Sequence, residues 1–165
     1  MSHMTMRNLT LIVGLLAGST AQAKPTSAYA SLQSAKSGDG VIEIREIKPK
    51  KLMLYLKIIQ MVSRDSDLLA ATGRPRLAVV FSGEAVSHLS VSRVINEENR
   101  QFYSDLDSKI GELLADGITV EFCRGAARVL GLIPKSAVPV TAEIDNAWVS
   151  IIGYQQQGYA YIPGF

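Results

Sequence analysis

Short runs of apolar and β-branched residues recur along the chain and predict the strands of a sheet. Five such runs are present, at residues 41–47, 77–81, 118–122, 138–140 and 159–162. The run at 77–81 is apolar throughout, as in a central strand that is buried on both faces. Pro139 has no backbone N–H, so the run around it is predicted at an edge or at a strand end.

Segments with the three- and four-residue spacing of amphipathic helices separate these runs. The stripe that follows Pro49 consists of Leu52, Tyr55, Leu56, Ile59 and Val62. A second stripe consists of Phe102, Leu106, Ile110, Leu113 and Leu114. The polar stretch between them, residues 87–100, fits neither a helix nor a strand pattern.

Two further helices are predicted in the last third of the chain. A short one begins at Arg124 and ends at Gly131, and Asp145 is expected to cap another that Gly158 closes. The strands and helices therefore alternate, and this order implies a parallel sheet with helices on both faces. We predict an α/β fold, a three-layer α/β/α arrangement with a mostly parallel, five-stranded sheet.

The N-terminus has the pattern of a secretory signal peptide over residues 1–23. Arg7 supplies the positive charge, residues 9–18 form a short apolar core, and Ala21 and Ala23 match the small-x-small cleavage pattern. We therefore expect a periplasmic or otherwise exported protein. An uncleaved membrane anchor and a buried N-terminal strand or helix are the alternatives. Residues 24–40 are rich in Ser, Ala, Gly and Lys and are predicted to be a flexible lead-in.

Composition narrows the function classes. The chain has 165 residues, of which 47% are hydrophobic and 19% charged, so one folded domain is expected over residues 41–165. A formal net charge of +2 with dispersed basic residues gives no support for a nucleic-acid partner. The chain has two histidines, and neither a G-x-G-x-x-G nor a Walker A motif occurs, so we expect no cofactor and no bound metal.

Cys123 is the single cysteine of the chain and stands where a strand meets a helix. The free N–H groups of the helix, with Arg124 and Arg128 nearby in sequence, would stabilise its thiolate. Gly125 would let the backbone approach the sulfur closely. Glu121 lies two residues before Cys123, so its side chain is expected on the same face of the strand, where its negative charge would disfavour the thiolate. The alternative is a buried, inert cysteine that acts as a small hydrophobic residue.

Other polar residues are predicted at the same edge of the sheet, because the carboxyl ends of parallel strands gather there and form the usual ligand site. After the first strand come Arg45 and Lys48, and after the second come Ser82, Gly83 and Glu84. With Arg124 and Gly125, the residues after the second strand are the candidate binding positions around Cys123. His88 is a candidate base for the thiol, although a solvated surface histidine is the simpler interpretation.

Three segments resemble the exported branch of the DsrE/DsrF-like sulfur-relay family. They are the cysteine region at 117–132, the strand and Phe-Ser-Gly-Glu-Ala-Val turn at 77–86, and the helix, Gln-x-x-Gly turn and aromatic strand at 148–162. The order and spacing of the three carry the resemblance. The first strand, 41–47, is more charged than that family's pattern.

The resemblance implies an α/β/α domain in which Cys123 carries sulfane sulfur as a persulfide. Its partners would be a sulfur donor or acceptor protein or a small thiol, and the chain would form homo-oligomers, trimers or hexamers. A membrane would be a partner only if the signal segment is uncleaved. Because the chain has no second cysteine, any sulfur chemistry must use a partner thiol. The competing hypothesis is a non-catalytic oligomeric binding or assembly module in which Cys123 is structural.

Overall fold

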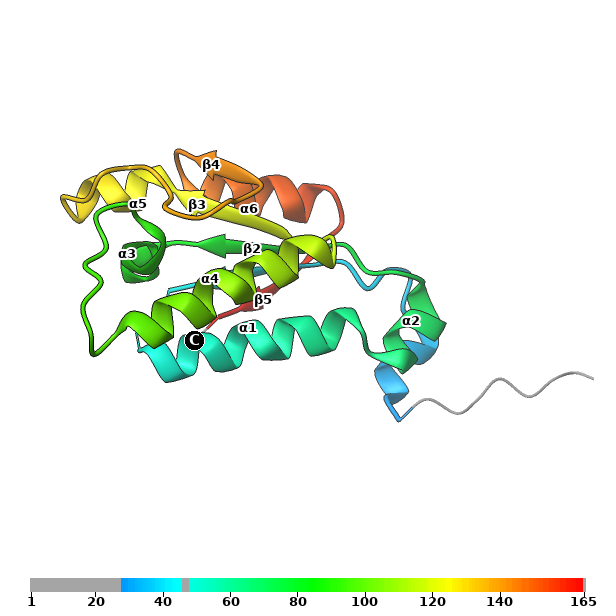
Figure 1. Ribbon diagram of the computed structural model, residues 1–165. Helices are drawn as coiled ribbons and strands as arrows, with labels where there is room; N and C mark the ends of the chain where they lie inside the picture. The colour runs from blue at the N-terminus through cyan, green and yellow to red at the C-terminus, as the bar shows by residue number, and fades with distance from the viewer. Residues whose placement is uncertain (1–27, 46–47, 165) are drawn as a thin grey trace, which may run out of the picture.

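Five parallel strands form one sheet in this protein (Figure 1). The structure is a computed structural model and describes residues 28–45 and 48–164. The strands are β1 (Gly40–Ile44), β2 (Leu77–Phe81), β3 (Thr119–Cys123), β4 (Ala142–Ile144) and β5 (Ala160–Pro163). Their order is β4-β3-β2-β1-β5, and every neighbouring pair is parallel. The predicted α/β fold with a parallel five-stranded sheet is confirmed.

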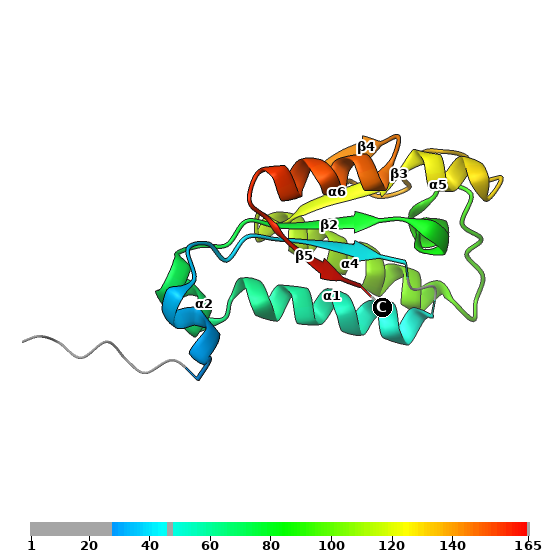
Figure 2. The same ribbon diagram turned by 180° about the vertical axis from the view of Figure 1, so that it is seen from behind.

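Helices cover both faces of the sheet. They are α1 (Pro49–Ser63), α2 (Ser66–Thr72), α3 (Val86–Leu89), α4 (Arg100–Ala115), α5 (Arg124–Val129) and α6 (Ala147–Gln156). Helices α1 and α4 lie on one face and α6 on the other, and the view from behind shows the same layers with β5 at the sheet edge (Figure 2). The predicted three layers are therefore present.

The two long helices follow the predicted stripes. In α1 the side chains of Leu52, Leu56 and Ile59 are buried, and Pro49 occupies its first turn, where a missing N–H costs nothing. In α4 the buried positions are Leu106, Ile110 and Leu113, which face the sheet as the spacing predicts. The central strand β2 is buried at all five positions, as its apolar run requires.

The predicted strand at 138–140 is wrong. The fourth strand lies at Ala142–Ile144, where it pairs with β3 from Glu121 onwards. Pro139 cannot donate to a ladder, and pairing with β3 starts only after it. Thr141 begins this pairing, since its N–H donates to the carbonyl of Val120 over 2.7 Å.

Three other segments differ from the predicted boundaries. Strand β1 ends at Ile44, so Arg45 follows it directly. The segment before Gly73 contains a second helix, α2, whose first turn is capped by the Asp65 side chain. The polar stretch after Ser82 begins with a 3-10 turn, η2 (Gly83–Ala85), and the short helix α3, and then continues as a loop.

The predicted signal segment, residues 1–23, lies outside the described residues. Within the predicted lead-in, Ala30–Ser34 form a 3-10 turn, η1. Asp39 accepts two hydrogen bonds from the Arg76 side chain, at 2.9 and 2.6 Å, just before β1 begins. In the part of the chain that the structure describes, no helix is both long and apolar enough to cross a membrane.

Candidate functional site

Cys123 is the last residue of β3 and the N-cap of α5, the strand-to-helix position that its sequence predicts. Its sulfur accepts a hydrogen bond from the Ala126 N–H at 3.4 Å and lies 3.9 Å from the carbonyl oxygen of Asp145. The side chain is only 4% exposed. The sulfur is therefore held among backbone groups, at the carboxyl edge of the sheet.

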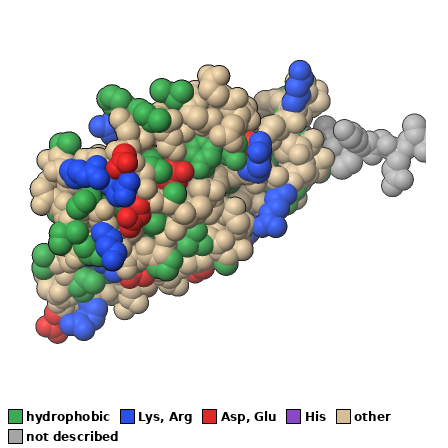
Figure 3. All heavy atoms as spheres, turned by 90° about the horizontal axis from the view of Figure 1, so that it is seen from above, with side chains coloured by type: hydrophobic (Ala, Val, Ile, Leu, Met, Phe, Trp, Pro, Cys, Tyr) green, Lys and Arg blue, Asp and Glu red, His purple; other side chains and the backbone are tan. Residues whose placement is uncertain are grey.

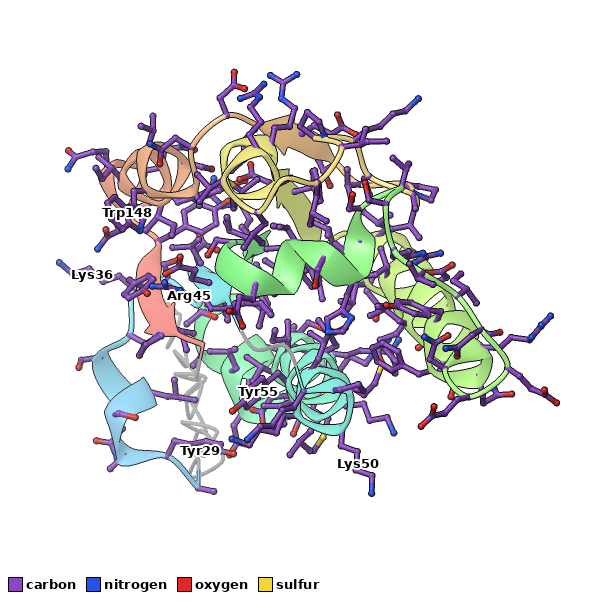
Figure 4. The ribbon with its side chains drawn as sticks, turned by 90° about the vertical axis from the view of Figure 1, so that its left-hand side faces the viewer. Tyr29, Lys36, Arg45, Lys50, Tyr55 and Trp148 are labelled. Atoms are coloured by element: carbon purple, nitrogen blue, oxygen red, sulfur yellow. The ribbon has the colours of Figure 1, made fainter. Side chains whose placement is uncertain are left out.

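An open pocket at this edge reaches the buried sulfur. Its lining residues are Glu43, Arg45, Ser82, Gly83, Cys123, Gly125, Ala126, Val129, Asp145, Asn146, Ala147 and Trp148. Figure 4 looks onto this side of the molecule and labels Arg45 and Trp148, which lie toward the β5 side of the view. The structure therefore brings segments after β1, β2, β3 and β4 together around one thiol.

Four of the predicted site residues, Cys123, Gly125, Ser82 and Gly83, line this pocket. The remaining two, Arg124 and Glu84, are not among its lining residues. Glu84 is exposed on η2, where its carbonyl oxygen accepts a hydrogen bond from Ser87. Four of the six residues therefore lie together at one edge of the sheet, and other polar groups, Glu43, Arg45 and Asp145 among them, join them there.

The predicted partners of the thiolate, Arg124 and Arg128, are paired with a carboxylate. Arg124 lies 2.9 Å and Arg128 lies 3.2 Å from the Asp145 carboxylate. Hydrogen bonds from Arg128, which have the larger effect, and from Arg124 hold the pKa of the Asp145 carboxyl below its usual value. Figure 3 shows basic and acidic side chains gathered at the α5 end of this face. The two guanidinium groups are thus largely committed to Asp145.

The expected antagonist of the thiolate, Glu121, is bound by α6. It is buried on β3 and accepts hydrogen bonds from the Ser150 hydroxyl at 2.5 Å and the Tyr154 hydroxyl at 2.8 Å. Burial, which is the larger cause, and the hydrogen bond to Glu121 raise the pKa of the Tyr154 hydroxyl above its ordinary value. Glu121 therefore joins the sheet to α6, and it is absent from the residues that line the Cys123 pocket.

Glu43 is a pocket residue that the sequence analysis missed. It is buried on β1 and accepts hydrogen bonds from the Ser82 hydroxyl at 2.5 Å and the Tyr161 hydroxyl at 3.1 Å. The register aligns Glu43 with Val80, and Val80 with Glu121, across adjacent strands. The charged residues in the first strand could have pointed to Glu43, because a carboxylate buried in a strand needs hydrogen-bond donors around it.

His88 takes no part in the pocket. Its side chain is buried on α3, and its ring packs edge-on against Phe102 with the centroids 5.2 Å apart. The Tyr103 ring also lies near the His88 ring, with the centroids 6.1 Å apart. Among the described residues there is also no group of three or more His, Cys, Asp or Glu side chains that could hold a metal ion.

A protein-family model for the DsrE/DsrF-like family matches residues 56–163, which is most of the chain. The chain belongs to the DsrE/DsrF-like family. The matched range runs from the middle of α1 to the end of β5 and includes Cys123 and α5. No curated protein matches this chain.

Two solved structures share the fold of this DsrE/DsrF-like chain. A protein of unknown function from Methanobacterium thermoautotrophicum, MTH1491, aligns with a TM-score of 0.56 and 19% identity, covering 76% of this chain and 97% of its own. The ychN protein from E. coli aligns with a TM-score of 0.50 and 15% identity, covering 77% and 99% respectively. At these identities the likeness shows the fold alone.

The pocket of this DsrE/DsrF-like chain has an apolar rim. Trp148 on α6 is 67% exposed and Val129 on α5 is 87% exposed, and both line the pocket. Val149 and Ile152 continue the exposed apolar surface along α6. Asn146 caps α6 by accepting the Trp148 N–H, so the predicted cap, Asp145, is off by one residue. That shift leaves the Asp145 carboxylate for the two arginines of α5.

Proposed function

We propose that this protein accepts sulfane sulfur on Cys123 as a persulfide and transfers it to another thiol. The observation that carries the proposal is the pocket itself, which opens onto the only cysteine of the chain at the carboxyl edge of a parallel sheet. Membership of the DsrE/DsrF-like family, whose relatives include sulfur-relay proteins, supports the same chemistry.

The geometry suits a thiolate nucleophile in a confined place. The Ala126 N–H points at the sulfur and would stabilise negative charge on it. In the proposed reaction the Cys123 thiolate attacks the outer sulfur of a donor, and the donor's sulfur–sulfur bond breaks. Its electron pair leaves with the donor, and Cys123 keeps the transferred sulfur. An acceptor thiolate then attacks the outer sulfur of the Cys123 persulfide, and the electron pair of the broken sulfur–sulfur bond returns to Cys123. No outside oxidant or reductant is consumed.

Burial restricts the donors that can react. Cys123 is only 4% exposed, and the open pocket gives access to its sulfur. A small molecule, or a persulfide on a protruding chain segment, fits such an entrance. A donor sulfur within a flat protein surface does not.

Mass spectrometry of the native protein after incubation with inorganic polysulfide tests the proposal. We expect the peptide with Cys123 to gain one or more sulfur atoms, and a second incubation with a small thiol to remove them. The variant Cys123→Ser should gain none. Failure of Cys123 to gain sulfur, under conditions in which a small control thiol does, would overturn the proposal.

The exposed apolar surface favours a second candidate, an assembly module in which Cys123 only fills space. Besides the rim of the pocket, an apolar pocket lies between α1 and the edge strand β5. Its lining includes Tyr55, Ile58, Ile59, Ile162 and Pro163. Such surfaces commonly mark protein contacts. If this candidate is right, Cys123→Ser will keep the native assembly and every activity of the protein.

Assembly and export are part of the same proposal. We propose a homo-oligomer, a trimer or hexamer, in which these apolar surfaces contact other copies. Sedimentation equilibrium gives the mass directly, and a monomer at micromolar concentration would contradict the assembly. For export, the N-terminus of the protein recovered from cell fractions is the test. A chain that keeps residues 1–23 in the cytosol would contradict it.

A further inference from the structure

Arg45 is the one cation among the described residues that lines the Cys123 pocket. It follows β1 directly, is exposed, and lines the same pocket as Cys123. Between described residues no hydrogen bond or ion pair holds its guanidinium, although burial raises the pKa of the Tyr161 hydroxyl and the nearby Arg45 charge opposes that rise. Arg124 and Arg128, by contrast, are both paired with Asp145. Within the described residues, the Arg45 guanidinium is therefore available to donate hydrogen bonds to a ligand in the pocket.

The position of Arg45 is set by its neighbours. Gly83 has φ +51, and a Cβ added there would lie 3.3 Å from the Arg45 Nε. The Arg45 side chain thus lies along the glycine backbone, at the point where β2 gives way to η2. A bulkier residue at 83 would press on the guanidinium, so this backbone shape keeps Arg45 at the pocket.

Two carboxylates, Glu43 and Asp145, line the pocket together with Arg45. Asp145 is held by Arg124 and Arg128, and Glu43 is buried and accepts from the Ser82 and Tyr161 hydroxyls. Arg124 and Arg128 lie outside the lining but pair with Asp145, so the three guanidinium groups and two carboxylates sum to one positive charge. Of these three guanidinium groups, Arg45 is the one that lines the pocket, and it offers planar donors suited to an oxyanion.

We propose that Arg45 selects small anionic sulfur donors, in which a sulfane sulfur is bonded to a sulfonate group, as in thiosulfate. This inference rests on the proposed function of Cys123. The thiolate attacks the outer sulfur, the sulfur–sulfur bond breaks, and sulfite leaves with the electron pair while Cys123 retains a persulfide. Arg45 would bind the sulfonate oxygens and offset the repulsion between thiolate and anion. It is a specificity-determining residue of the pocket.

The test compares two alkylating reagents of nearly the same size, anionic iodoacetate and neutral iodoacetamide, on the native protein. Arg45→Gln is expected to lower the iodoacetate rate at Cys123 by roughly fivefold and to leave the iodoacetamide rate unchanged. Arg45→Lys should restore part of the difference. Lys57→Gln removes one positive charge from the exposed face of α1, away from the pocket, and should change neither rate.

Thiosulfate itself is the second probe. Mass spectrometry should show slower persulfide formation by Arg45→Gln than by the native protein, with a weaker dependence on ionic strength. If Arg45→Gln changes the rates of both alkylating reagents equally, or changes neither, the inference is overturned. If the native Cys123 takes sulfur from neither polysulfide nor thiosulfate, the proposed function fails, and the reagent comparison still decides whether Arg45 recognises anions.

Discussion

Gly125 lies so close to the Asp145 backbone that no residue with a side chain fits at position 125. A Cβ at position 125 would be 2.2 Å from the carbonyl oxygen of Asp145 and 3.8 Å from the Cys123 sulfur. The glycine lets the start of α5 pack against the turn between β4 and α6. The same contact brings the Asp145 carbonyl within 3.9 Å of the sulfur. One missing side chain therefore determines the shape of the thiol pocket.

Gly125→Ala should destabilise the protein by about 1–3 kcal/mol, because the added methyl group must displace backbone. Urea unfolding followed by circular dichroism measures the change. Gly111→Ala is the matched control, since nothing lies within 4 Å of a Cβ at that position in α4. The control should be more stable than the native protein by about 0.5–1 kcal/mol. Equal stability of both variants would contradict the close contact.

Tyr154→Phe should cost about 1–3 kcal/mol of stability, because it removes a donor from the buried Glu121 carboxylate. The ring itself is retained, so the loss reports the hydroxyl alone. Tyr159→Phe is the control, as its ring packs on Tyr154 and its hydroxyl makes no hydrogen bond to another described residue. Thermal unfolding of the three proteins compares them. A loss no greater in Tyr154→Phe than in the control would refute the role given to this bond.

Stability should fall at alkaline pH, because burial and Glu121 raise the pKa of Tyr154 in the folded state. A raised folded pKa contributes stability that is complete below the unfolded pKa of about 10 and is lost as pH rises toward the folded pKa. Unfolding midpoints measured from pH 8 to above pH 10 should show a decline that is shallower in Tyr154→Phe. Parallel curves for the two proteins would show that another group causes the decline.

Asp145→Asn should make the thiol pocket more attractive to anions. The change removes the carboxylate that both Arg124 and Arg128 engage, while the Asp145 carbonyl near the sulfur is kept. We expect the rate of Cys123 with iodoacetate, relative to iodoacetamide, to rise roughly threefold. Asp116→Asn, which alters an ion pair with Arg64 outside the pocket, should leave the ratio unchanged. A ratio that falls in Asp145→Asn would contradict this electrostatic account.

Much of the fold could be predicted because it depends on local patterns. Leu52, Leu56 and Ile59 recur at helical spacing and are buried in α1. The continuous apolar run Leu77–Phe81 forms the fully buried β2. The fourth strand could not be placed in this way. Residues Ala142–Ile144 are partly exposed, and three residues are too few to show the alternating pattern of a strand. They form a strand because they pair with β3.

The candidate site was predictable in position but incomplete in its chemistry. Cys123 and Gly125 adjoin a strand end, and Ser82 and Gly83 adjoin another, so the rule for parallel sheets places them together. Glu43 was missed, because a lone acidic residue in a strand gives no hint of its donors. Those donors are Ser82 and Tyr161, which lie 39 and 118 residues away along the chain.

The order of residues was enough to predict a parallel α/β domain with one thiol at the carboxyl edge of its sheet. Those features follow from hydrophobic period, helix spacing and the place of Cys123 between a strand and a helix. The pairing of the charged groups at the pocket could be read only from the folded chain. Asp145 lies 21 and 17 residues from Arg124 and Arg128 along the chain and pairs with both, whereas Arg45 lines the pocket without a hydrogen bond to another described residue. Such pairing depends on distances in space, which the order of residues does not contain.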